Sequence, residues 1–179
     1  AGSQIEFANL RIKEVGFDYL NELEEYWEST SRKRGGWKQM GDSIVGEKGN
    51  ESILETVKDD YQNFRIRLDW KLTKGAEGTL HLRGAVCNEA AVQLGGAKPG
   101  SGGLPGIFVE PDESRDNPEG QWNFLEARVM NNVISVWLNG DDVVEKAKLP
   151  RGGTTASSGP IALSHNGRPM QFRNIRIRP

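Results

Sequence analysis

Strict alternation of apolar and polar residues is the clearest pattern in this chain. Over residues 63–72, every second side chain is apolar and the positions between are mostly charged. A period of two is that of a β-strand with one buried and one solvated face. The pattern returns over residues 79–84, where two leucines face the core. The polar face of that strand carries Thr79, His81 and Arg83.

Further short strands are predicted wherever such runs lie between glycine, proline or asparagine turns. They are predicted at residues 5–15, 37–46 (a hairpin), 52–57, 90–94, 107–109, 122–130, 133–139, 161–164 and 172–177. The hairpin turns at Gly41-Asp42, and Asn139-Gly140 is typical of a type I′ turn. One segment, residues 17–29, instead spaces its apolar residues as a short amphipathic helix does.

About a dozen short strands joined by turns normally close as two packed sheets. We therefore predict a single all-β domain over residues 1–179, an antiparallel two-sheet jelly-roll sandwich with at most one short helix near the N-terminus. Trp122 is expected in the core. Trp137 alternates with Val136 and Leu138 and is expected to point away from it.

Composition narrows the function classes. The chain has 23 Lys and Arg against 25 Asp and Glu, and this balance argues against a nucleic-acid partner. The basic stretch at residues 173–178 is instead predicted to be a strand with outward arginines. No apolar run approaches the roughly 20 residues of a membrane-spanning helix, so no membrane partner is expected.

The single cysteine, Cys87, excludes an intramolecular disulfide and a cysteine-based zinc site. No signal peptide is present, but the first residues could be a trimmed end, so this does not argue for the cytoplasm. We expect an exported, periplasmic bacterial protein. The oligomeric state is left open.

Several motifs occur in a characteristic order. They are NFRIRLDWKL, LHLRG, VQLGG followed by GSGGLPG, then GQWN, ISVWLNG, GPIALSHNG and QFRNIRIRP. In this order they resemble the 3-keto-disaccharide hydrolase family, over residues 37–179. The resemblance implies a concanavalin-A-like jelly roll and a carbohydrate-active hydrolase or lyase that acts on a small saccharide or glycoside. In that chemistry a carbonyl at C3 acidifies the neighbouring C–H, a base removes that proton, and elimination is followed by hydration.

Three departures from the family pattern leave a non-catalytic glycan-binding module open, as well as an interaction domain without a sugar site. Glu77-Gly78-Thr79 replaces Asn-Ser-Gly, Ala90 and Ala91 replace an aromatic residue and a glutamate, and Ser164 replaces an acidic or amide residue.

Two histidines and one arginine are the main candidates for chemistry. His165 aligns with a family histidine and is the predicted general acid or base; alternatively it caps a turn by bonding backbone. Arg83 matches a family arginine whose fork can hold hydroxyls or a carbonyl, or it pairs with a carboxylate. His81 can act near neutral pH, or is an exposed polar-face histidine.

The predicted substrate-binding set is Arg83, Gln93, His81 and Glu77. The amide of Gln93 can read a sugar hydroxyl, or is a buried structural amide. No motif fixes the carboxylate pair of an ordinary glycosidase. The glycine-rich segment 93–106 lacks the features of a phosphate loop and is interpreted as the lip of the cleft. No cofactor is predicted. A divalent metal could polarise the carbonyl, but no ligand spacing demands one.

Overall fold

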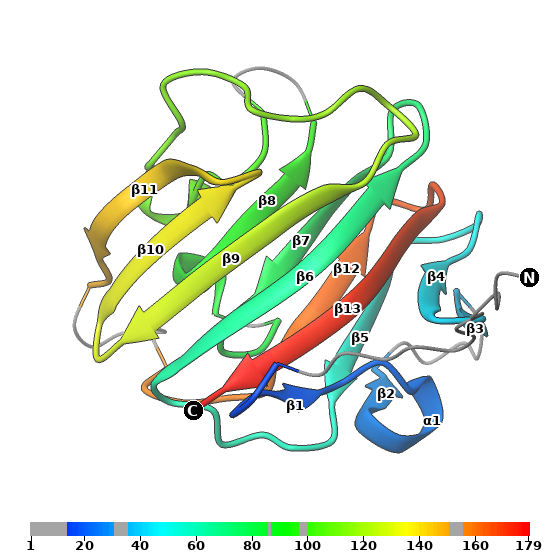
Figure 1. Cartoon of the computed structure of the whole chain (residues 1–179), viewed down its shortest axis with the longest axis horizontal. Coiled ribbons are helices and arrows are strands. Elements are labelled where there is room, and N and C mark those ends of the chain that lie inside the picture. Colours follow the sequence, from blue (N-terminus) through cyan, green and yellow to red (C-terminus); the bar gives the residue numbers. More distant parts are fainter. Residues whose placement is uncertain (1–13, 31–35, 86, 97–99, 151–155) are drawn as a thin grey trace, which may run out of the picture.

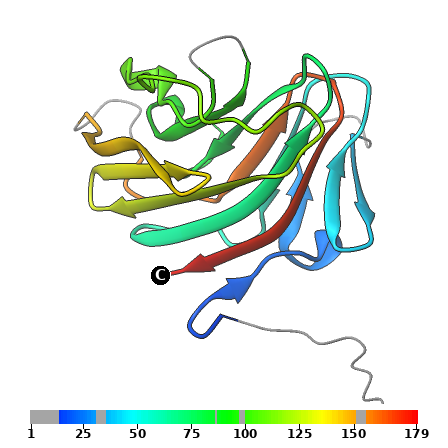
Figure 2. The same ribbon diagram turned by 45° about the horizontal axis from the view of Figure 1, so that its top comes forward.

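Two antiparallel β-sheets packed face to face form the protein (Figures 1 and 2). The structure is a computed structural model that describes residues 14–30, 36–85, 87–96, 100–150 and 156–179. The predicted all-β, two-sheet sandwich is confirmed. In the described parts of the chain, no helix is long and apolar enough to cross a membrane.

The larger sheet, here called sheet A, has eight strands. Their order is β11 (Asp141–Lys148), β10 (Val133–Leu138), β9 (Asn123–Met130), β6 (Phe64–Leu72), β13 (Met170–Arg178), β4 (Ser43–Gly46) and β3 (Trp37–Met40), with β1 (Asp18–Tyr19) also paired to β13.

The smaller sheet, sheet B, has five strands. Their order is β2 (Trp27–Ser29), β5 (Ser52–Thr56), β12 (Ala162–His165), β7 (Glu77–His81) and β8 (Ala91–Gly95). The described helical pieces are α1 (Leu23–Tyr26) and two 3₁₀ turns, η1 (Asn88–Ala90) and η2 (Pro105–Ile107).

The core lies between the sheets, and strand β6 shows why the alternating pattern forms it. Its inward side chains are at most 2% exposed: Phe64, Ile66, Leu68 and Trp70. Burying each such side chain contributes roughly 1.5–3 kcal/mol. This confirms the strand predicted at residues 63–72.

The outer face of sheet A carries charged side chains that pair across strands. Arg67 Nε lies 2.6 Å from Glu126 Oε2, and Arg173 Nε lies 3.2 Å from Asp69 Oδ2. The outward arginines predicted for residues 173–178 are thereby confirmed. Surface ion pairs contribute little to stability. The burial of apolar side chains on the inner face is therefore the main contribution to the stability of this sheet.

One short helix near the N-terminus is confirmed, although over a narrower range than predicted; one predicted strand is wrong, and another lies almost wholly outside the described residues. The helix at residues 17–29 shortens to α1, because its N-cap makes no side-chain hydrogen bond and Trp27 joins β2 opposite Thr56. Residues 107–109 form no strand, since η2 ends at Phe108 in the left-handed region (φ 57°). The strand predicted at residues 5–15 lies almost wholly outside the described residues.

Of Trp122, which precedes β9, and Trp137 on β10, one follows its prediction. Trp137 is half-buried on the outer face of sheet A, as expected from the alternation of β10. Trp122 is not in the core: Arg173 lies 4.0 Å and Lys71 4.7 Å from its ring centre, on the outside of the same sheet. Cations placed over an indole are attracted by its π-system, which accounts for a surface tryptophan here.

Candidate functional site

A cleft of about 630 Å³ lies on the outer face of sheet B. Its floor is one row of four neighbouring strands, in which Ile53 is paired with Ser164, Ser164 with Thr79, and Thr79 with Gln93. Directly paired residues of adjacent strands point to the same face of a sheet. The floor therefore presents two hydroxyls and an amide side by side.

The two 3₁₀ turns form one wall of the cleft, to which η1 contributes Asn88 and η2 contributes Pro105, a residue of the glycine-rich segment 93–106. The loop is fixed to the floor through backbone: Gln93 N–H donates to Gly103 O (3.0 Å) and Gly102 N–H to Gln93 O (2.8 Å). A Cβ on Gly106 would lie 2.1 Å from Asn88 O, so only glycine permits this approach.

His81 lies on the same outward face as the floor and lines the cleft. Its side chain is buried (7% exposed), and its Nε2 is 3.4 Å from Ser164 Oγ. Nδ1 is buried without a hydrogen-bond partner. Burial disfavours the imidazolium and lowers the pKa of His81 to about 4. The ring is therefore neutral near pH 7 and able to accept a proton.

Glu77 and Gln93 also line this cleft, and their substrate-binding role stays a prediction. Glu77 is exposed at the start of β7, opposite Gly95. The amide nitrogen of Gln93 donates to Gly95 O at 3.1 Å. That bond holds the amide nitrogen, while the amide oxygen is a hydrogen-bond acceptor.

His165 borders one end of the cleft, but its ring turns toward the inside of the sandwich. It is 3% exposed, its Nδ1 accepts the Gly167 N–H at 3.1 Å, and its ring meets Trp37 edge to face at 5.0 Å. Burial lowers its pKa, against a smaller raising effect of the Gly36 backbone. This is the geometry of the turn-capping alternative; a catalytic role stays a prediction.

Arg83 does not share the cleft, and the prediction that placed it there is wrong. Strand β7 ends at His81, so its alternation does not extend to Arg83, which is 1% exposed and lines a different pocket. Its guanidinium donates to carbonyl oxygens of three separate segments: Gln62, Asn131 and Ala156. It is also 3.4 Å from Asn132 Oδ1.

Sequence reasoning placed the glycine-rich segment at the lip of the cleft, but it missed Asn88 in the wall and the outward position of Ser164 in the floor. The alternation Leu163-Ser164 would have placed that hydroxyl outward, had it been extended to β12. No comparable signal marks Asn88. In the residues that the structure describes, no three His, Cys, Asp or Glu side chains converge as metal ligands would.

Comparison with known proteins assigns the chain to a protein family. The sequence profile of the 3-keto-alpha-glucoside-1,2-lyase-like domain matches residues 20–178. The chain belongs to this family. No curated protein matches the chain significantly.

Solved structures share the sandwich at low sequence identity. A candidate glycosyl hydrolase of Parabacteroides distasonis has a TM-score of 0.72 and 18% identity, covering 91% of this chain and 93% of its own. A carbohydrate-binding module of Bacillus subtilis has 0.63 and 14%, covering 86% and 95%. A Bacillus subtilis protein of unknown function with a galectin-like fold has 0.60 and 10%, covering 92% and 94%. These likenesses show the fold.

Of the positions at which the resemblance predicts a departure from the family pattern, Glu77, Gly78, Thr79 and Ser164 line the cleft. Ala91 lies directly opposite His81, and Ser164 opposite Thr79, all on the outward face. Ala90 is fully buried in η1.

We expect acid to destabilise the protein through His81. Its pKa is about 4 when folded and about 6.5 when unfolded, so between these values the unfolded state binds more protons. The contribution of His81 to the free energy of unfolding is therefore fully present above about pH 6.5. It falls by roughly 3 kcal/mol as the pH drops to about 4. Urea unfolding at pH 7, 6, 5 and 4 measures this. The carboxylates contribute equally to the pH dependence of unfolding in the wild type and in a His81→Gln variant. The variant should therefore lose only the part of this dependence that is due to His81. If the free energy of unfolding depends on pH in the same way in both proteins, the lowered pKa of His81 is refuted.

Proposed function

We propose that this protein cleaves 3-keto-glycosides in the cleft of sheet B, by elimination followed by hydration. One observation carries the proposal: a neutral, desolvated histidine, His81, lies beside a floor of hydroxyl and amide groups. Membership of the 3-keto-alpha-glucoside-1,2-lyase-like family supports the substrate class.

The reaction needs a base and needs no carboxylate pair. The carbonyl at C3 acidifies the proton on C2, and the His81 imidazole accepts it. The electron pair released forms the C1–C2 double bond as the C1–O bond breaks, and the leaving oxygen takes a proton back from the imidazolium. Water then adds across the double bond, with its oxygen bonded to C1. The products are the 3-keto sugar and the free alcohol.

The floor of the cleft supplies the groups that orient such a sugar. The hydroxyls of Thr79 and Ser164 can donate to the C3 carbonyl or to neighbouring hydroxyls, and the Gln93 amide can read a hydroxyl. Glu77 lies at the rim, where its carboxylate can accept hydrogen bonds from hydroxyls. The cleft volume of about 630 Å³ lies in the usual range for small-molecule sites, roughly 300–1,000 Å³.

A non-catalytic glycan-binding module is the second candidate. It is favoured by Ala91 and Ser164, which replace family residues that bear acidic or amide groups beside the same floor. In that case the cleft would hold a saccharide through Gln93 and the hydroxyls without turnover.

Incubating the purified protein with a 3-keto-glucoside tests the proposal. We expect release of the alcohol, with the parent glucoside uncleaved because it has no C3 carbonyl. Replacing Gln93 by leucine should raise KM about fivefold, since one hydrogen bond is worth roughly 1 kcal/mol. Saccharide binding without turnover would establish the binding module instead. If the protein neither binds the saccharide nor turns it over, sheet B is not a sugar site.

A further inference from the structure

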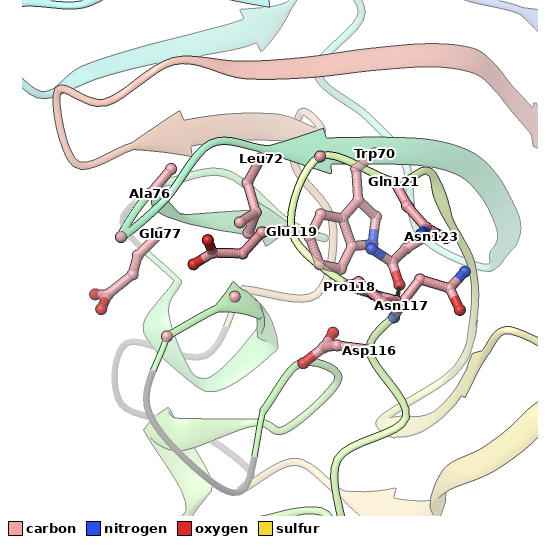
Figure 3. Close-up of a pocket in the computed structure, with 14 residues that line it drawn as sticks. Trp70, Leu72, Ala76, Glu77, Asp116, Asn117, Pro118, Glu119, Gln121 and Asn123 are labelled. Carbon is pink, nitrogen blue, oxygen red and sulfur yellow. Dashed lines mark hydrogen bonds between the residues drawn. The ribbon is translucent and has the colours of Figure 1, made fainter.

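A second pocket, of about 380 Å³, opens at one end of the sandwich. It lies where β6 and β8 end and the segment 116–121 crosses between the sheets (Figure 3). Glu77 lines both this pocket and the cleft of sheet B, so the two are neighbours. The proposed reaction uses nothing else in it.

Three carboxylates surround the pocket: Glu77, Asp116 and Glu119 (Figure 3). Among the residues that the structure describes, no lysine or arginine lines it. Asp116 is anchored through one oxygen only, since Oδ2 accepts the Ser101 N–H at 3.0 Å and lies 3.2 Å from Ser114 Oγ. Its Oδ1 is buried and has no hydrogen-bond partner. The site therefore offers an unused acceptor and an excess of negative charge.

The pocket also contains an unused donor. Trp70 is 1% exposed, and its indole Nε1 is buried without a hydrogen-bond partner. In Figure 3 this nitrogen faces the side of the pocket formed by Asn117 and Asn123. An unpaired buried donor costs roughly 1–3 kcal/mol, a cost that a ligand with an acceptor at this point would offset.

These features define the ligand by its chemistry. It must bear a positive charge to complement the carboxylates, donate to Asp116, and accept from Trp70. A metal ion cannot accept a hydrogen bond from the Trp70 indole N–H. In the described residues, moreover, no three acidic side chains converge on one point as metal ligands would. A cationic molecule with hydroxyls, the size of one sugar ring, fits all three requirements.

We propose that this pocket binds an amine-bearing monosaccharide unit. The protonated amine donates to Asp116, the carboxylates of Glu119 and Glu77 add negative charge elsewhere around the pocket, and a ring or hydroxyl oxygen accepts from Trp70 Nε1.

Titration of the ¹⁵N-labelled protein with glucosamine tests this directly. The indole N–H signal of Trp70 is identified by its loss in Trp70→Phe, and we expect it to shift as glucosamine is added. Glucose, which has the same ring without the amine, should bind at least tenfold more weakly. Asp116→Asn and Glu119→Gln should each weaken glucosamine binding about tenfold or more.

Glu110→Gln is the matched control, because Glu110 is an exposed acid of the same loop region outside the pocket; it should bind glucosamine as the wild type does. Equal affinity for glucose and glucosamine, an unmoved Trp70 signal, or no effect of Glu119→Gln would each overturn the proposal. Glu119 is exposed, so its variant is expected to fold normally. The assay involves no turnover, and His81→Gln should leave glucosamine binding intact, so its outcome is separate from that of the lyase proposal.

Discussion

Replacing Arg83 by alanine is expected to lower the free energy of unfolding by about 3–5 kcal/mol. The fully buried guanidinium donates hydrogen bonds to the carbonyl oxygens of Gln62, Asn131 and Ala156, which belong to three separate segments. Alanine would leave these acceptors buried without a donor, and would leave a cavity where the side chain was. Lysine would not restore them, because one ammonium cannot match the planar fork of arginine.

Thermal unfolding of Arg83→Ala measures this effect, with a midpoint expected roughly 10 °C below that of the wild type. Arg128→Ala is the matched control, since Arg128 is exposed on the outer face of β9, and it should change the midpoint little. If Arg83→Ala has the same unfolding midpoint as the wild type but no longer binds saccharide, the arginine belongs to a binding site after all.

Replacing His81 by glutamine is expected to reduce turnover of a 3-keto-glucoside by about 100- to 10,000-fold, the usual contribution of a positioned base. Glutamine keeps a polar side chain of similar length beside Ser164 but cannot accept the C2 proton. Because the pKa of His81 is lowered to about 4, the wild-type kcat/KM should stay constant through neutral pH. It should fall as the pH drops through about 4, where the ring becomes protonated.

His165→Gln separates the two histidines, with rates expressed per folded protein. Its ring turns inward against Trp37, so we expect turnover within a few-fold of the wild type together with some loss of stability. The opposite result, in which His165→Gln abolishes turnover and His81→Gln does not, would return the base to the position that the family resemblance indicates.

Much of the fold follows from local patterns. The alternation over residues 63–72 fixes which side of β6 is buried, because a strand has only two faces and one must exclude water. The Asn139-Gly140 turn joins β10 to β11 with both residues at positive φ (54° and 98°), as a type I′ turn requires. Alternation also placed Gln93 and Thr79 on one polar face, and the structure puts both on the floor of the cleft.

The arrangement of the site depended on tertiary structure. Alternation assigns a face only while a strand lasts, and β7 stops at His81, so the sequence could not show that Arg83 turns away to hold three loops together. Strand pairing, which no local pattern encodes, set His165 opposite Gly78 on the inner face and left His81 between two alanines on the outer one. The sequence by itself determined that a polar strand face with a histidine would exist. Only the packing of the two sheets decided which histidine faces the cleft, because burial of a side chain depends on what the rest of the chain places against it.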